Sequence, residues 1–422
     1  MENSVNKYDN EIKNLLKMYF AEDDFKKLIF DSNHLASSNG GSAQISDLYK
    51  KQLDIRIEDN CNRMQIDRAI TFAEKKLNSD KYFEFILKLG EICNDAGKYY
   101  LAQEIFNKIN RRTKNKTLKA KSLIGMADIC SRKANWTRSI SLVTEAESIY
   151  KETNDKAGIS NCFNMLGTIS GEMGDIEKAK TYFNQSLFFA NDSDEKELYA
   201  KIEANLGIVN SILGNTEEAV EHLEISLNIY KEIKDLKKVS ELYHNIGTNF
   251  LQSNDTKSAV AAFDKGIDIA IENQYWSPLA LLYLAKSQVL ITNNEIPSAK
   301  EFADKALSIS HNLDDKLTIA DIYRVRGMIA KQLNDTQTAK SYLMISLRIN
   351  TNQRNSLNIA ETSAELASIY KEEGKHELGN NYLNQALDYY RKNNAKDKIL
   401  MIEKMLALEP VQSNAAEVQD EQ

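Results

Sequence analysis

Residues that commonly end helices, Gly or Asn, recur at one fixed position of a repeating pattern through most of this chain. Stretches such as "MGDIEKAKTYF" (173–183) and "LGNTEEAVEHL" (213–223) repeat one pattern every 40 residues. The first site of the pattern holds Gly or Asn in six successive repeats, namely Gly174, Gly214, Asn254, Asn294, Asn334 and Gly374. Gly and Asn most readily adopt the left-handed conformation that closes a helix. We therefore predict a tight turn between two helices at each site.

The residues around each turn site support this interpretation. Capping residues follow the site directly in four repeats, at Asp175, Asn215, Asp255 and Asp335. A small residue stands seven positions before the site, at Gly167, Gly207, Gly247, Ser287, Gly327 and Ala367. A helical Gly costs about 0.5–1 kcal/mol relative to Ala, so its recurrence needs a compensating gain, which close packing of two helices supplies. Each repeat is predicted to be an antiparallel helix pair.

The repeats divide the chain into six predicted segments. In order, these are an amphipathic helical segment (1–34), a flexible linker (35–45), a degenerate first repeat (46–80), eight repeats (81–394), a C-terminal capping helix (395–410) and a disordered acidic tail (411–422). The first segment has helical apolar spacing at Ile12, Leu15 and Leu16. The capping helix must end at Pro410.

The alternating Leu-Gly, Gly-Asp or Gly-Asn, and Ala sites in paired helices resemble the tetratricopeptide repeat family over about residues 81–408. The period of 40 residues exceeds the family's usual value of about 34. Prolines are also missing where the family often ends its second helix, and longer helices would explain both departures. The resemblance implies an all-α fold, a right-handed superhelical α-solenoid of antiparallel helix pairs. Such long repeats are similar to those of kinesin light chains and bacterial peptide-pheromone receptors, which bind peptides in the superhelical groove.

Composition excludes several classes of partner and compartment. The net charge of −7 and the absence of a long Lys/Arg run argue against nucleic acid. No apolar run approaches the 18 residues of a membrane span, and the first residues lack the regions of a signal peptide. The four cysteines, Cys61, Cys93, Cys130 and Cys162, form no CxxC pair and are expected to be buried thiols. We expect a cytoplasmic protein without a membrane partner.

The sequence contains no recognisable catalytic, cofactor or metal motif. The five histidines include no pair four residues apart, which a helical metal site would use. Phosphate-binding glycine loops and nucleophile elbows are also missing. We therefore expect no enzyme activity, no cofactor and no metal.

A polar set of side chains recurs on the first helix of each pair. Positions six, three and two before the small residue, and one after it, lie on one side of a helix with 100° per residue; we call this set the polar stripe. In tetratricopeptide arrays it lines the concave surface. The predicted groove residues on it are Asn161, Asn164, Lys201, Asn205, His244, Asn245 and Arg324.

Asn205 and Asn245 occupy the position where the family usually has Asn, whereas Met165 fills it one repeat earlier. Because Asn both donates and accepts hydrogen bonds, such a row pairs with a peptide backbone. A solvated helix face explains the same residues, so both interpretations stay open. Leu281 and Leu284 also fall on the stripe, either as an anchor for a partner or through tighter packing of their helix.

Lys286 and Arg326 replace the apolar residue directly before the small site, and the sequence offers no reason for them. The main functional expectation is a non-catalytic scaffold or adaptor that binds a peptide segment of a partner in the concave groove. The alternative is a peptide-sensing regulatory protein whose output is the helical segment 1–34. An enzyme is the third possibility.

Overall fold

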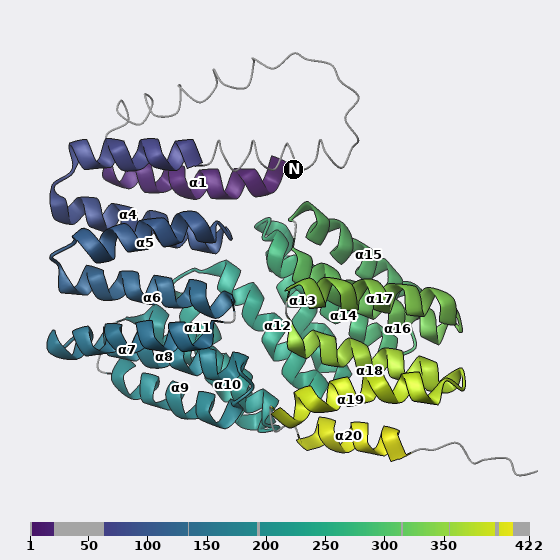
Figure 1. Ribbon diagram of the computed structural model, residues 1–422. Helices are drawn as coiled ribbons and strands as arrows, with labels where there is room; N and C mark the ends of the chain where they lie inside the picture. The colour runs from purple at the N-terminus through teal and green to yellow at the C-terminus, as the bar shows by residue number, and fades with distance from the viewer. Residues whose placement is uncertain are drawn as a thin grey trace, which may run out of the picture. The chain divides into compact units, whose positions relative to one another are not determined.

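The computed structural model describes residues 2–20, 63–133, 135–191, 195–313, 315–353, 355–392 and 396–407. The predicted linker (35–45), the predicted acidic tail (411–422) and Cys61 lie outside these residues. All regular elements of the described residues are α-helices, which confirms the predicted fold class (Figure 1). Two compact units make up the chain, residues 1–169 with 182–195 and residues 170–181 with 196–422.

The helices follow one another without any other regular element. The first pairs are preceded by α1 (Glu2–Tyr19) and by helical residues 63–76. The first helices of the pairs are α4 (Ser79–Asp95), α6 (Lys116–Arg132), α8 (Lys156–Glu172), α10 (Lys196–Ile212), α12 (Leu236–Gln252), α14 (Trp276–Thr292), α16 (Lys316–Gln332) and α18 (Ser356–Glu372). The second helices are α5 (Tyr99–Arg112), α7 (Trp136–Glu152), α9 (Ile176–Ala190), α11 (Thr216–Glu232), α13 (Thr256–Glu272), α15 (Ile296–Asn312), α17 (Thr336–Gln353) and α19 (His376–Lys392), and α20 (Lys396–Ala407) ends the series.

The turns at the predicted sites are left-handed. Asn334 has φ of 59°, and its N–H donates to the carbonyl of Lys331 at 2.9 Å while the N–H of Asp335 donates to Ala330 at 3.0 Å. This pair of bonds satisfies carbonyls at the end of the helix. Asp335 then caps the next helix by accepting from the N–H of Thr338 at 3.1 Å. The prediction for the Gly/Asn sites is confirmed, except that Asn215 bonds Asn210 instead of capping its helix.

Three of the described turns from a second helix to the next first helix have the same conformation, which the sequence did not predict. Asn154, Lys234 and Gln274 have φ of 53°, 60° and 56°. They lie midway between the predicted sites, so from α8 onward a helix begins every 20 residues. A 40-residue repeat is therefore two nearly equal helix-and-turn halves. At the start of α14, Tyr275 is the N-cap residue and forms no side-chain hydrogen bond with the helix.

Close packing explains the recurring glycines. A Cβ atom at Gly207 would lie 2.6 Å from Cγ of Leu223, and one at Gly327 would lie 2.7 Å from Cγ of Leu343. Both leucines belong to the second helix of the same pair. A side chain at either glycine would push that helix away, so the helical cost of Gly is offset by burial of the opposing leucine.

The two terminal helices are packed against their neighbours. Ile12, Leu15 and Leu16 of α1 are buried in the core of the first unit, and the ring of Tyr19 meets Phe85 of α4 edge to face at 5.4 Å. In the second unit, α20 buries Ile402 against α19. Among the described cysteines, Cys93 and Cys162 are buried thiols, whereas Cys130 is only half-buried.

Candidate functional site

Asn205 and Asn245 occupy equivalent places on α10 and α12 of the second unit. Each side chain is half-buried and stands two residues before a glycine that packs against a second helix, Gly207 on Leu223 and Gly247 on Phe263. These contacts fix the rotation of both first helices. Lys201, one turn earlier than Asn205, is exposed. The two amides are thus presented by helices of the same orientation, 40 residues apart.

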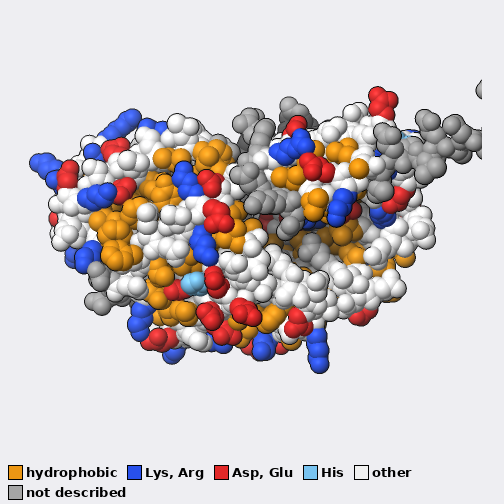
Figure 2. All heavy atoms as spheres, turned by 90° about the horizontal axis from the view of Figure 1, so that it is seen from below, with side chains coloured by type: hydrophobic (Ala, Val, Ile, Leu, Met, Phe, Trp, Pro, Cys, Tyr) orange, Lys and Arg blue, Asp and Glu red, His pale blue; other side chains and the backbone are white. Residues whose placement is uncertain are grey.

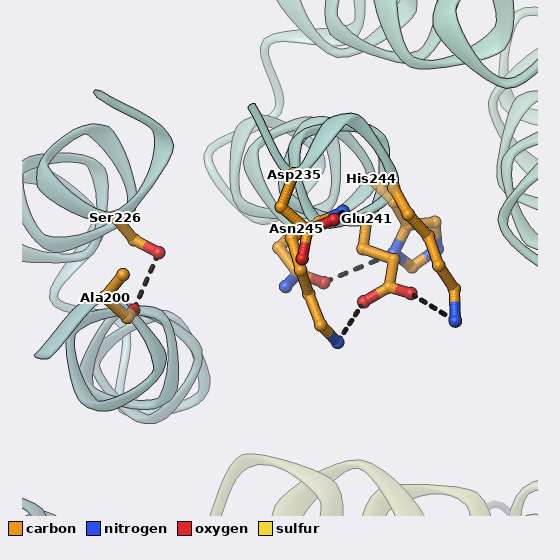
Figure 3. A network of polar contacts seen from close by, with 8 residues as sticks. Ala200, Ser226, Asp235, Glu241, His244 and Asn245 are labelled. Atoms are coloured by element: carbon orange, nitrogen blue, oxygen red, sulfur yellow. Dashed lines mark hydrogen bonds and ion pairs between the residues drawn. The ribbon is translucent and has the colours of Figure 1, made fainter. Parts of the chain in front are cut away.

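His244 and Glu241 accompany Asn245 on α12. Figure 3 shows the three side chains on the same side of the helix. The Nδ1 atom of His244 lies 3.4 Å from Oδ1 of Asn245. Burial lowers the pKa of His244, and the contact with Asn245 opposes this shift only in part. The imidazole is therefore neutral at physiological pH, where it offers one donor and one acceptor. Glu241 forms ion pairs with Lys238 at 2.7 Å and Lys237 at 3.9 Å.

Arg324 of α16 takes part in a polar cluster with α18. Its guanidinium lies 3.1 Å from the carboxylate of Glu361, and the side chain is 15% exposed. Asp321, one turn earlier, accepts from Nδ2 of Asn358 at 2.6 Å. Burial raises the pKa of Asp321 to about 6, although nearby Arg324 lowers it. The predicted groove residue Arg324 is thus held by a neighbouring carboxylate. Asn358 and Glu361 of α18 were missed because only α16 was expected to contribute there. Asp321 was missed although it lies on α16 six residues before Gly327, which is a position of the polar stripe.

Asn161 and Asn164 lie on α8, in the part assigned to the first unit. Asn161 is half-buried, whereas Asn164 is 2% exposed and its carbonyl accepts from Oγ1 of Thr168 at 3.1 Å. Asn164 is therefore a core residue in this structure. The partly exposed amides at the family's Asn position are those of α10 and α12.

The two leucines of the stripe on α14 have different environments. Leu284 is 6% exposed and packs in a core cluster with α15 and α16, whereas Leu281 is 36% exposed. Tighter packing accounts for Leu284. Only Leu281 presents an apolar surface.

Lys286 and Arg326 form equivalent ion pairs inside the second unit. Lys286 pairs with Asp264 of α13, and Arg326 pairs with Asp304 of α15. Each cation also lies over an aromatic ring of its own second helix, Lys286 Nζ at 4.7 Å from the centroid of Phe302. Both aspartates stand 22 residues before their partners, so comparing repeats at that offset would have revealed the pairs.

A shallow pocket of about 510 Å³ adjoins Lys286 between α13 and α15. Its lining residues are Thr256, Lys257, Val260, Lys286, Leu290, Asn293, Glu295, Ser298 and Phe302. In the described part of the chain, no group of three or more His, Cys, Asp or Glu side chains is placed to hold a metal ion. The described helices also include none that is long and apolar enough to cross a membrane.

A buried acid occurs in place of an aromatic residue on α10. Glu203 is 2% exposed and lies 2.5 Å from Nδ1 of His222 on α11. The equivalent positions of two later repeats hold ring pairs, Tyr283 with Phe302 and Tyr323 with Tyr342, whose centroids are 5.5 Å and 5.8 Å apart. The pair therefore joins the two helices of its repeat, as the rings do elsewhere.

Two family models described as tetratricopeptide repeat match the chain, one over residues 198–272 and the other over 160–187. The longer match contains Asn205 and Asn245 together with the glycines that position them. No curated protein sequence matches the chain significantly.

Several solved structures share the fold. A Rap protein complexed with Competence and Sporulation Factor is 13% identical, with a TM-score of 0.60 over 90% of this chain and 99% of that chain. The apo quorum sensor NprR from B. thuringiensis is 14% identical, with a TM-score of 0.55 over 87% and 99%. The Rap conjugation gene regulator of plasmid pLS20, in complex with the Phr* peptide, is 15% identical, with a TM-score of 0.54 over 85% and 96%. The chain therefore carries tetratricopeptide repeats over residues 160–187 and 198–272, within an all-helical array that has the fold of these three structures.

Proposed function

We propose that this protein is a non-catalytic, peptide-sensing regulator that binds a peptide segment through the polar stripe of α10 and α12. The observation that carries the proposal is the pair Asn205 and Asn245, two partly exposed amides held at equivalent places of successive repeats. An Asn side chain donates to a peptide carbonyl and accepts from a peptide N–H. Such contacts hold a backbone regardless of its side chains. Neutral His244 adds a further polar group beside Asn245.

The solved relatives favour a sensor over a static scaffold. One is complexed with Competence and Sporulation Factor, one with the Phr* peptide, and one is named a quorum sensor. At 13–15% identity they establish only the fold, so their ligands support a hypothesis for this chain. We infer that its 40-residue repeats are a long form of the tetratricopeptide repeat acting in the cytoplasm.

We assign the output to the N-terminal helical segment. Its described helix, α1, packs on α4 through three buried side chains and Tyr19. Transmission requires ligand binding to change the protection of α1, which hydrogen exchange of Glu2–Tyr19 measures with and without ligand. A scaffold would bind the same ligand and leave that exchange unchanged.

The double variant Asn205→Ala/Asn245→Ala tests the binding site. Affinity capture from the native cell, followed by calorimetric titration of the captured segment, should show binding at least about tenfold weaker, because two or more hydrogen bonds of about 0.5–1.5 kcal/mol each are lost. The matched control is Asn228→Ala/Asn384→Ala, which removes two exposed asparagines from the second helices α11 and α19. Equal affinity of the two double variants would contradict the proposed site.

A further inference from the structure

One second helix, α9, presents an aromatic ring where the others present polar side chains. Phe188 is 69% exposed. On the face that Figure 2 presents, exposed apolar side chains occur in separate groups between charged and polar ones, so exposure alone does not single out a residue. The comparison of repeats does, because the equivalent residues of α7, α11, α13, α15, α17 and α19 are Ser148, Asn228, Asp268, Ser308, Arg348 and Asp388. The fold therefore does not require an apolar side chain at this place.

The ring of Phe188 is supported by other rings. It meets the ring of Phe189 edge to face, with the two centroids 5.3 Å apart. Phe189 is stacked in turn on Phe163 of α8, with centroids 5.7 Å apart and the ring planes at 10°. A side chain that is already held in place loses little conformational entropy when a partner covers it. Phe188 is therefore suited to be the anchor of an interface.

The surface around Phe188 carries no charge. Residues 182–191 include no Asp, Glu, Lys or Arg. The exposed side chains of this segment are Asn184, Gln185, Phe188 and Asn191, and their spacing places them on one side of α9. We call these four residues the amide-aromatic face. Few charged and many aromatic side chains are what distinguish the core of a protein interface from the rest of a surface.

A second copy of this chain has the chemistry that the amide-aromatic face requires. The amides of Asn and Gln both donate and accept hydrogen bonds, so each can pair with the same group of another copy. Two phenylalanine rings also attract each other in offset or edge-to-face geometry.

The charge of the chain favours the same occupant. The net charge is −7, and α11 exposes four acids, Glu217, Glu218, Glu221 and Glu224. Two copies repel each other where such acidic faces meet. The uncharged face of α9 can approach its equal without that repulsion.

We propose that the amide-aromatic face is the interface of a homodimer, in which two α9 helices pack antiparallel and each Phe188 lies against the ring and amides of the other copy. Such an interface is isologous, with the same patch on both sides of a two-fold axis. The proposed peptide site lies on the first helices α10 and α12, so the dimer does not depend on it.

Sedimentation equilibrium of the full chain over a series of concentrations tests the dimer. The wild type should dimerise, and Phe188→Asp should weaken dimerisation at least about a hundredfold, because the anchor is lost from both copies and two like charges meet across the axis. Asp already occupies the equivalent place in α13 and α19, so the variant should keep the helical circular dichroism of the wild type. The control Ile271→Asp changes an exposed isoleucine of α13 in the same way and should leave dimerisation unchanged.

A mixing experiment tests whether Phe188 faces its own copy. Phe188→Arg should also prevent dimerisation, and α17 has Arg at the equivalent place. Mixing the Phe188→Asp and Phe188→Arg variants should restore a dimer with one copy of each, because opposite charges then meet across the axis. The proposal is overturned by a wild type that stays monomeric at every concentration, by a Phe188→Asp variant that dimerises as the wild type does, or by a mixture that stays monomeric.

Discussion

The first helices α10 and α12 differ from α14 and α16 in where they place polar side chains. Directly before the small site, α10 and α12 have the buried apolar residues Leu206 and Ile246, and one position earlier they present asparagines. At these two positions α14 and α16 reverse the order. On these two helices the buried residues Ala285 and Val325 replace the asparagines, and Lys286 and Arg326 replace the apolar residues.

Polar side chains on the first helices therefore have two different environments within one fold. On α10 and α12 the asparagines are half-buried and belong to the polar stripe. On α14 and α16 the cations are directed at the preceding second helix, where Asp264 and Asp304 neutralise them. The asparagines of α10 and α12 are the residues of the proposed binding site, whereas the cations of α14 and α16 hold successive repeats together.

The largest expected effect comes from placing a lysine where no partner exists. Leu366 of α18 occupies the position of Lys286, but Met344 stands where Asp264 would be. Leu366 is fully buried, so Leu366→Lys should lower the free energy of unfolding by about 3–5 kcal/mol, the cost of an uncompensated buried charge. Urea denaturation followed by circular dichroism measures this loss.

Lys286→Leu is the matched control. It restores the residue type of the other repeats, and the side chain of Asp264 is 47% exposed, so the carboxylate that loses its partner stays solvated and the loss is small. We expect stability within about 1 kcal/mol of the wild type or above it. Similar losses in both variants would show that the cation position is equivalent in all repeats.

Asp321→Asn tests the charge buried between α16 and α18. The pKa of Asp321 is raised to about 6, so the folded chain binds a proton more tightly than the unfolded chain, and the wild type loses stability as pH rises through about 4 to 6. At pH 7.5 the variant should be more stable by up to about 3 kcal/mol, and the difference should vanish below about pH 4. A gain in stability that does not change with pH would contradict the buried charge of Asp321 as its cause.

The turns give a smaller effect. Asn334 has positive φ, so Asn334→Val should cost about 1–2 kcal/mol, whereas Asn334→Gly should be tolerated. Thermal melts of the two variants measure the difference. Equal melting temperatures would mean that the backbone at this turn relaxes without strain.

A turn from a second helix to the next first helix offers a related test of left-handed strain. Lys234 is left-handed without being Gly or Asn, so Lys234→Gly should stabilise the protein by about 1 kcal/mol or less. The reference is Gly214, which already has the favoured residue at a left-handed site. A destabilised Lys234→Gly variant would show that the lysine side chain contributes more than its strain costs.

The periodic features of the fold were predictable from the sequence because each has a local cause. Left-handed Asn334 and the close contact of Gly207 with Leu223 both follow from residue types at a fixed phase. Left-handed Lys234 was not predictable, because lysine has no preference for that conformation.

The candidate site was predictable only in part. The stripe positions of Asn205 and Asn245 follow from helix geometry, but burial of Asn164 depends on its neighbours. The bond between Asp321 and Asn358 joins two repeats, so neither helix reveals it alone. Contacts between helices of different repeats are the part that a periodic pattern does not specify.

The most direct test of the central claim is calorimetric titration of a bound peptide against Asn205→Ala/Asn245→Ala. If α10 and α12 present these amides for binding, affinity should fall at least about tenfold, equivalent to about 1.4 kcal/mol, while the melting temperature stays within about 2 °C of the wild type. Unchanged affinity in a folded double variant would contradict the claim that these amides hold the ligand.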